Sequence, residues 1–266
     1  MRAARGLGTT AGAVLAAVAL LVLTSCGSAG GPSARDLDGR TFLSTAVTRD
    51  GAPHELVRDT RVRVSFADGQ VSANAGCNTA SGRYRVDAGT LELEDGLAVT
   101  EMGCEEELQA QDEWLWELLS AAPAVALDED RLSLRTESTV LELLDRVVAD
   151  PDRPLVGEPW TVDSLVSGDA VSTTPGDATA SLQFGDDVVQ VDTGCNRGRA
   201  GYERDGDRLT LGPLALTRMA CPGDADELER AVVAVLESSP LTLEIEAARM
   251  TLTSADGTRG LGLRQE

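Results

Sequence analysis

Aromatic residues are scarce in this chain. Phe, Trp and Tyr together make up 3% of its 266 residues. The core must therefore be built mainly from Leu, Val and Ala, and few side chains are available for stacking nucleic-acid bases. The formal net charge of -21 also opposes binding to a phosphate backbone, which basic patches bind by releasing counterions. The sequence predicts no nucleic-acid partner.

Lysine is absent and histidine almost so. All 23 basic residues are Arg, which excludes a Schiff-base or general-base lysine. His54 is the single histidine, and the chain has no His-Glu-x-x-His, Gly-x-Ser-x-Gly or Gly-rich phosphate loop. We therefore expect a protein that is not an enzyme, with no catalytic residue, no metal and no cofactor. A hydrolase remains an alternative, which loss of an activity on mutation of His54 would support.

The first residues are typical of an exported protein. Arg2 and Arg5 precede an apolar run of 13 residues, 11–23, which is too short to cross a bilayer comfortably as a mature helix. The Leu-Thr-Ser-Cys that ends at Cys26 resembles the bacterial lipobox, whose cysteine is acylated. The resemblance implies a signal peptide over 1–25 and a lipid, such as palmitate, on Cys26. An ordinary secretory signal is the alternative.

A flexible tether is predicted over 26–36, because this segment is rich in Gly, Ser and Pro. Loss of Arg2 and Arg5 with the signal peptide would leave 21 basic and 44 acidic residues, a net charge of -23. The expected location is the cell membrane, on its extracytoplasmic side. There the acidic body would be repelled by anionic headgroups while the lipid anchors the chain.

The rest of the sequence is an internal repeat. When Cys77 is set on Cys195, an offset of 118 also superimposes the residue pairs Leu37/Leu155, Gly39/Gly157, Phe42/Trp160, Phe66/Phe184, Tyr84/Tyr202 and Leu91/Leu209. Thr-Glu-Met-Gly-Cys at 100–104 matches Thr-Arg-Met-Ala-Cys at 217–221 at an offset of 117. These matches predict a tandem duplication, with domains over 37–147 and 155–266 and a linker over 148–154.

Each copy resembles the META domain, also called the HslJ-like domain. The resemblance rests on an opening Leu-x-Gly-x-x-aromatic, a Gly-Cys-Asn followed by an aromatic residue, and Thr-x-Met-x-Cys before a helical pattern. Phe42 departs from the Trp that is usual at its position. The resemblance implies a small antiparallel barrel-like fold related to lipocalins, with one helix, on bacterial envelope lipoproteins. It implies no established catalytic activity.

Hydrophobic periodicity independently indicates a mainly β, β-rich α+β fold. Residues 61–66 alternate polar and apolar side chains, and 131–144 and 249–263 have the pattern of hairpins. One helical pattern per copy lies between the last Cys and these hairpins. In the second copy we expect a capping box of Asp224 and Glu227 at its start.

The remaining four cysteines are expected to form disulfides within each copy, Cys77 with Cys104 and Cys195 with Cys221, because an oxidising compartment favours disulfides and duplication gives each copy its own pair. Redox chemistry is the alternative. We interpret the repeated motif residues as structural, with a ligand site as the alternative. These residues are Gly76, Asn78, Tyr84, Thr100 and Met102 in the first copy, and Gly194, Asn196, Tyr202, Thr217 and Met219 in the second.

The sequence favours a non-catalytic envelope lipoprotein, acting as an interaction or stress-protection module. Its partners would be the membrane, through the lipid anchor, and an unknown envelope protein. The alternative is a carrier of a small apolar ligand, because lipocalin-like barrels can enclose one.

Overall fold

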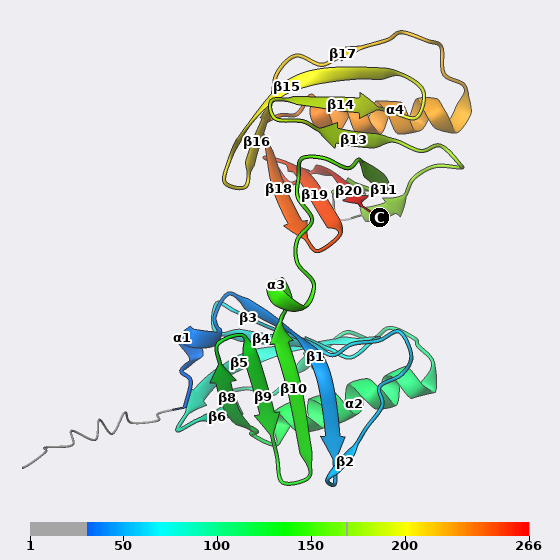
Figure 1. The fold of residues 1–266 in the computed structure, drawn as a ribbon. Coiled ribbons are helices and arrows are strands. Elements are labelled where there is room, and N and C mark those ends of the chain that lie inside the picture. Colours follow the sequence, from blue (N-terminus) through cyan, green and yellow to red (C-terminus); the bar gives the residue numbers. More distant parts are fainter. Residues whose placement is uncertain (1–30, 169, 266) are drawn as a thin grey trace, which may run out of the picture. The chain divides into compact units, whose positions relative to one another are not determined.

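The computed structural model describes residues 31–168 and 170–265 (Figure 1). The predicted signal peptide, Cys26 and residues 26–30 of the predicted tether lie outside the described residues. The folded chain begins with the short helix α1 (Ala34–Leu37), in which Leu37 is fully buried. Residues 34–36, expected in the tether, are therefore helical. The Asp36 carboxylate accepts hydrogen bonds from Ser33 N and Oγ at 2.8 and 2.7 Å, which lower its pKa.

The first copy forms a closed antiparallel barrel (Figure 1). Around the ring, each strand pairs with the next and β10 pairs back with β1. The ring consists of β1 (Arg40–Arg49), β3 (Arg63–Ala67), β4 (Gln70–Asn74), β5 (Thr79–Asp87), β6 (Thr90–Leu93), β8 (Ala124–Asp128), β9 (Arg131–Arg135) and β10 (Thr139–Asp145). The short strands β2 (Ala52–Pro53) and β7 (Ala98–Val99) pair with β1 and β5. Closure leaves the ring without a free strand edge.

The second copy repeats the same ring. It closes by the pairing of β11 with β20. The closing pair of each barrel has a register shift at the equivalent place, between Ser44 and Ala46 in β1 and between Val162 and Ser164 in β11. Its strands are β11 (Trp160–Ser167), β13 (Ser181–Phe184), β14 (Val188–Asp192), β15 (Arg197–Asp205), β16 (Arg208–Leu211), β18 (Leu241–Glu246), β19 (Arg249–Ser254) and β20 (Arg259–Arg264), with β12 (Ala170–Thr173) and β17 (Ala215–Leu216) attached. The mainly β prediction and the tandem barrels are confirmed.

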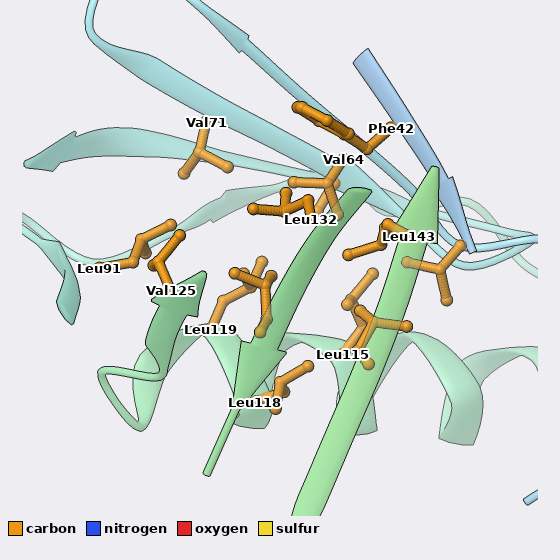
Figure 2. Packing of buried hydrophobic residues seen from close by; sticks show 14 of the residues in the cluster. Phe42, Val64, Val71, Leu91, Leu115, Leu118, Leu119, Val125, Leu132 and Leu143 are labelled. Atoms are coloured by element: carbon orange, nitrogen blue, oxygen red, sulfur yellow. The ribbon is translucent and has the colours of Figure 1, made fainter. Parts of the chain in front are cut away.

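Each barrel packs one long helix. Helix α2 (Glu106–Ser120) buries Leu115, Leu118 and Leu119 among strand residues such as Val71 and Leu132 (Figure 2). Helix α4 (Gly223–Leu236) does the same with Leu228, Val232, Val235 and Leu236. The short helix α3 (Arg146–Ala149) follows β10. Because the 3.6-residue period places these apolar positions on one face, the helix contributes a continuous stripe to the core.

The predicted capping box in the second copy is wrong. Helix α4 begins at Gly223 after the extended residue Pro222, and no side chain caps it. Asp224 therefore lies within the first turn, with Asp226. The free N–H groups at the start of a helix attract carboxylates. The acidic residues therefore stabilise the first turn by their charge, without forming a capping box.

Side chains fill the interior of both barrels. Phe42, Phe66 and Leu91 are no more than 1% exposed in the first, and Trp160 and Phe184 are equally buried in the second. This packing follows from the small ring, whose inward positions meet across the centre. Among the described residues, no helix has the length and apolar character needed to cross a membrane.

Candidate functional site

Both predicted disulfides are present. Cys77 bonds to Cys104 and Cys195 to Cys221, with sequence separations of 27 and 26. Each bond joins the loop that follows β4 or β14 to the segment that precedes α2 or α4. The repeated motifs Gly-Cys-Asn and Thr-x-Met-x-Cys therefore meet at one place in each barrel, which we call the disulfide clamp: Asn78, Thr100, Met102, Asp112 and their cystine, or Asn196, Thr217, Met219, Glu229 and theirs.

Asn78 connects the two motifs of the first clamp. Its Oδ1 accepts hydrogen bonds from Met102 N at 2.7 Å and Thr100 Oγ1 at 3.0 Å. Its Nδ2 donates to the Met102 carbonyl at 3.3 Å and to Cys77 Sγ at 3.1 Å. Asn78 is 6% exposed, so these bonds satisfy a buried amide. The asparagine is thus a structural partner of the disulfide.

Asn196 repeats this pattern in the second clamp. Its Oδ1 accepts from Met219 N at 2.8 Å and Thr217 Oγ1 at 2.6 Å, and its Nδ2 donates to the Met219 carbonyl at 3.1 Å. The same Nδ2 lies 3.3 Å from Cys221 Sγ. Both copies preserve the hydrogen bonds of the asparagine to the threonine and to the methionine backbone, so this asparagine and the disulfide together explain the spacing of the motifs.

A carboxylate from the helix completes each clamp. Asp112, fully buried, accepts from Asn78 N at 2.6 Å and Ala75 N at 3.1 Å. Glu229 is its counterpart at an offset of 117, and accepts from Asn196 N and Nδ2, both at 3.0 Å. Sequence analysis missed both residues. The two residues are related by the repeat offset of 117, which could have revealed them, but the match is not an identity because one copy has Asp and the other has Glu.

Glu229 is more exposed than Asp112 and also accepts from Thr193 Oγ1 at 2.6 Å. Burial raises the pKa of Glu229, but the hydrogen bonds from Thr193 and Asn196 outweigh burial and hold the pKa below its usual value. Its carboxylate and the sulfurs of Cys195 and Cys221 lie within 4.8 Å of one another. The sulfurs are bonded to each other, so they offer no thiolate to a metal ion.

The glycines of the motif serve the backbone. Gly76 has a φ of 135°, and a Cβ there would lie 2.9 Å from Thr60 Cγ2. Gly194 has a φ of 90°. The Gly76 N–H donates to the side-chain amide oxygen of Asn74 at 3.0 Å. The Gly194 N–H donates to the carboxylate of Asp192 at the same distance. These are turn geometries that glycine adopts without strain, which supports the structural interpretation.

The two tyrosines lie away from the clamps. Tyr84 packs against Phe66 with ring centroids 5.0 Å apart, and its hydroxyl donates to Ala34 O at 3.2 Å. Burial, followed by the charge of Asp38, raises the pKa of Tyr84 to about 12. Tyr202 packs edge-on against Phe184 at 5.2 Å. Both tyrosines stabilise the strands on which they lie.

The methionines of the motif act through their backbone. Their amide groups hold the clamp, while the side chains of Met102 and Met219 are 57% and 61% exposed. Each barrel therefore presents a flexible apolar side chain beside its disulfide.

His54 lies outside the clamp, in the segment after β2. Its ring is 6.0 Å from that of Trp114, between centroids. No serine or cysteine nucleophile is hydrogen-bonded to it among the described residues.

Comparison with known proteins identifies the family. The META domain model matches residues 35–147 and 153–266, so the chain belongs to the META domain family and carries two copies of the domain. One solved structure that matches is an NMR structure of a protein from Burkholderia xenovorans, at 22% identity and a TM-score of 0.37, covering 42% of this chain and 83% of that one. Another NMR structure matches at 25% identity and a TM-score of 0.35, covering 42% of this chain and 94% of that one. A search of curated proteins gave no match.

Proposed function

We propose that the chain is a non-catalytic lipoprotein, anchored by Cys26 at the outer face of the cell membrane, whose META barrels form an interaction or stress-protection module for another envelope protein. The observation that carries this proposal is the use of the repeated motifs. In both copies their polar side chains bond to one another and to the disulfide. The repeated motif residue that presents an exposed apolar side chain is the methionine, which is suited to adaptable protein contacts.

The anchor is tested by metabolic labelling with palmitate in a bacterial host. The full-length chain is expected to take up label and to enter the detergent phase, and Cys26→Ser is expected to do neither. Ser28→Ala, beyond the proposed cleavage site, is the matched control and keeps both properties. Equal labelling of Cys26→Ser would refute the anchor.

The partner surface is tested with a photocrosslinking residue placed at position 102 or 219 of the full-length protein in cells. A discrete adduct from either position is expected, with its partner identified by mass spectrometry and shown to bind the purified chain. The control position is Val171, which is 70% exposed and belongs to neither clamp. Adducts of the same pattern from position 171, or none from 102 and 219, would contradict the proposed surface.

A carrier that encloses its ligand inside the barrel is the weaker candidate. Both interiors are occupied by buried side chains, including Phe42 and Trp160 at 0% exposure. Native mass spectrometry of the protein purified from an oxidising compartment tests it directly. A stoichiometric extra mass that is lost on denaturation would favour the carrier, and a bare chain lower in mass than the reduced chain by four hydrogens would favour the interaction module.

A further inference from the structure

The sulfur-containing residues of the two barrels differ in oxidation state and in exposure. Among the described residues every cysteine is in a disulfide, so none carries a free thiol. Met250 on β19 is 1% exposed and packs in the core of the second barrel. Met102 and Met219 are 57% and 61% exposed. Within residues 31–168 and 170–265, reduced sulfur on the surface is therefore confined to these two side chains.

An exposed thioether is a target for two-electron oxidants. Peroxides convert methionine to methionine sulfoxide, and methionine sulfoxide reductases restore the thioether. A disulfide offers no thiolate to such an oxidant, and a thioether in a packed core is shielded by its neighbours. A limited amount of peroxide therefore meets two equivalent targets in the described part of the chain. Each target lies two residues before a disulfide cysteine.

The fold holds both methionines by atoms that oxidation leaves unchanged. Met102 N donates to Asn78 Oδ1 at 2.7 Å, and Met102 O accepts from Asn78 Nδ2 at 3.3 Å. The backbone of Met219 bonds to Asn196 in the same way, at 2.8 and 3.1 Å. Oxidation adds an oxygen to Sδ, at the exposed end of the side chain. Each clamp therefore keeps its hydrogen bonds when its methionine is oxidised.

Met250 is the opposite case. It pairs with Ile245 on β18 and with Leu263 on β20, and its side chain belongs to the apolar core. A sulfoxide is polar, and a buried polar group without a partner is costly. Oxidation of Met250 would therefore destabilise the second barrel. Burial protects the methionine whose oxidation would harm the fold, and exposure leaves open the two whose oxidation would not.

Oxidation changes the surface that the motif methionines present. A thioether is flexible, polarisable and apolar, and it adapts to the partner against which it packs. A sulfoxide is polar and chiral, and its oxygen accepts hydrogen bonds. A partner that packs on the thioether loses apolar contact when the sulfoxide forms. Because Met102 and Met219 hold equivalent positions, one oxidant changes both barrels in the same way.

We propose that Met102 and Met219 are sites of reversible oxidation, where peroxide forms methionine sulfoxide and weakens partner binding while both barrels stay folded. The Sδ lone pair attacks one oxygen of hydrogen peroxide, and the O–O bond breaks as the S–O bond forms. The departing hydroxide takes the proton of the transferred oxygen and leaves as water. Sulfur loses two electrons and the peroxide gains them. The effect on the partner rests on the proposed function, whereas the oxidation sites do not.

The sites are tested by peptide mapping of the purified full-length protein after treatment with hydrogen peroxide. A gain of about 16 Da is expected at Met102 and at Met219, with Met250 reacting at least about tenfold more slowly. In urea that unfolds both barrels, the three methionines are expected to react at one rate, because burial no longer protects Met250. Methionine sulfoxide reductases A and B together are expected to remove the added mass.

Urea unfolding of the same oxidised protein tests the fold. Its curve is expected to match that of the untreated protein, because the clamp hydrogen bonds persist. The matched control carries Met102→Leu and Met219→Leu together. It is expected to gain no mass at these positions and to keep one unfolding curve before and after peroxide.

The partner is tested with a photocrosslinking residue at position 101 or 218 of the full-length protein in cell membranes. Both positions are exposed, and each is next to an intact methionine. The adduct is expected to weaken at least about fivefold after peroxide and to return after the reductases act. The control with both leucines is expected to keep its adduct after peroxide, which excludes damage to the partner as the cause.

Oxidation of Met250 in the folded protein as fast as that of Met102 and Met219 would overturn the proposed sites. A destabilised protein after oxidation of those two alone would do the same. An adduct that peroxide leaves unchanged would overturn the effect on the partner. Absence of an adduct from both positions before treatment would refute the interaction surface, and with it that effect, while peptide mapping decides the sites by itself.

Discussion

Asn78 and Met102 lie 24 residues apart and are joined by two hydrogen bonds, from Met102 N to Asn78 Oδ1 at 2.7 Å and from Asn78 Nδ2 to Met102 O at 3.3 Å. Asn196 and Met219 form the same pair at 2.8 and 3.1 Å. In each pair the side-chain amide of the asparagine bonds to both the N–H and the C=O of the methionine, in place of a backbone partner. The disulfide alone would fix one point of each segment, and the amide fixes their orientation.

Replacing Asn78 by Ala is expected to destabilise the first barrel by about 1–3 kcal/mol, because the Met102 N–H loses its acceptor. The measurement is urea unfolding of the full-length protein. Met102→Leu is the control, and it is expected to change stability by less than about 0.5 kcal/mol, since that side chain is exposed. Equal losses for the two variants would contradict the role of the amide.

Asp112 is expected to be the more sensitive helix carboxylate. Asp112→Ala leaves the buried N–H groups of Ala75 and Asn78 without an acceptor, at about 1–3 kcal/mol each. Asp112→Asn keeps one acceptor oxygen and is expected to lose less. Glu113→Ala, an exposed neighbour on the same helix, is the control. Unfolding curves that superimpose for Asp112→Ala and Glu113→Ala would refute this expectation.

Glu229 is expected to make the second barrel sensitive to acid. Its folded-state pKa lies below its ordinary value of 4.5, so the unfolded state binds more protons below that pH. The stabilisation by Glu229 is therefore fully present above the ordinary pKa and is lost as pH falls through the folded-state value. Glu229→Gln should flatten this part of the stability profile, measured by urea unfolding between pH 6 and about pH 3. The profile of Glu203→Gln, an exposed site, should match that of the wild type.

Tyr84 is expected to ionise last of the two tyrosines. In Tyr202→Phe the remaining phenol should titrate with a midpoint near its pKa of about 12, followed by absorbance near 295 nm. Because the folded-state pKa is raised, stability is present below the ordinary value of 10.0 and falls as pH rises through the interval up to the folded-state value. A midpoint near 10 in the folded protein would contradict the buried environment.

Each disulfide is expected to stabilise its own barrel. Replacing Cys77 and Cys104 together by Ala should cost roughly 3.5 kcal/mol for a closed loop of 27 residues, from the entropy of the unfolded chain. Thermal unfolding should show two transitions, one with a lowered midpoint temperature and the other with an unchanged midpoint. The reciprocal variant of Cys195 and Cys221 should lower the other transition. A single transition lowered equally by either variant would argue against independent stapling.

Much of the fold follows from local pattern. The alternation in 61–66 and the hairpin pattern of 249–263 are set by side-chain period and turn chemistry, which act over a few residues. The structure places β3 and the β19–β20 hairpin there. The cysteine pairing was also predictable, because duplication left each copy with two cysteines. The prediction of a capping box was wrong because α4 begins at Gly223, directly after Pro222, and a four-residue sequence pattern does not encode that starting point.

The sequence by itself determined the duplication, the strand-rich class and the two staples, because these depend on repeated spacing and on short-range periodicity. Only the tertiary structure decided that Asp112 and Glu229 hold the clamps, that the motif methionines turn outward, and that Arg49 lies over the ring of Trp114. Asp112 and Glu229 bind backbone groups 33 to 37 positions away in the chain, and Arg49 and Trp114 are 65 positions apart. The direction of the methionines depends on which side of a closed barrel their side chains face. Contacts of that kind arise from packing in three dimensions, which no local pattern records.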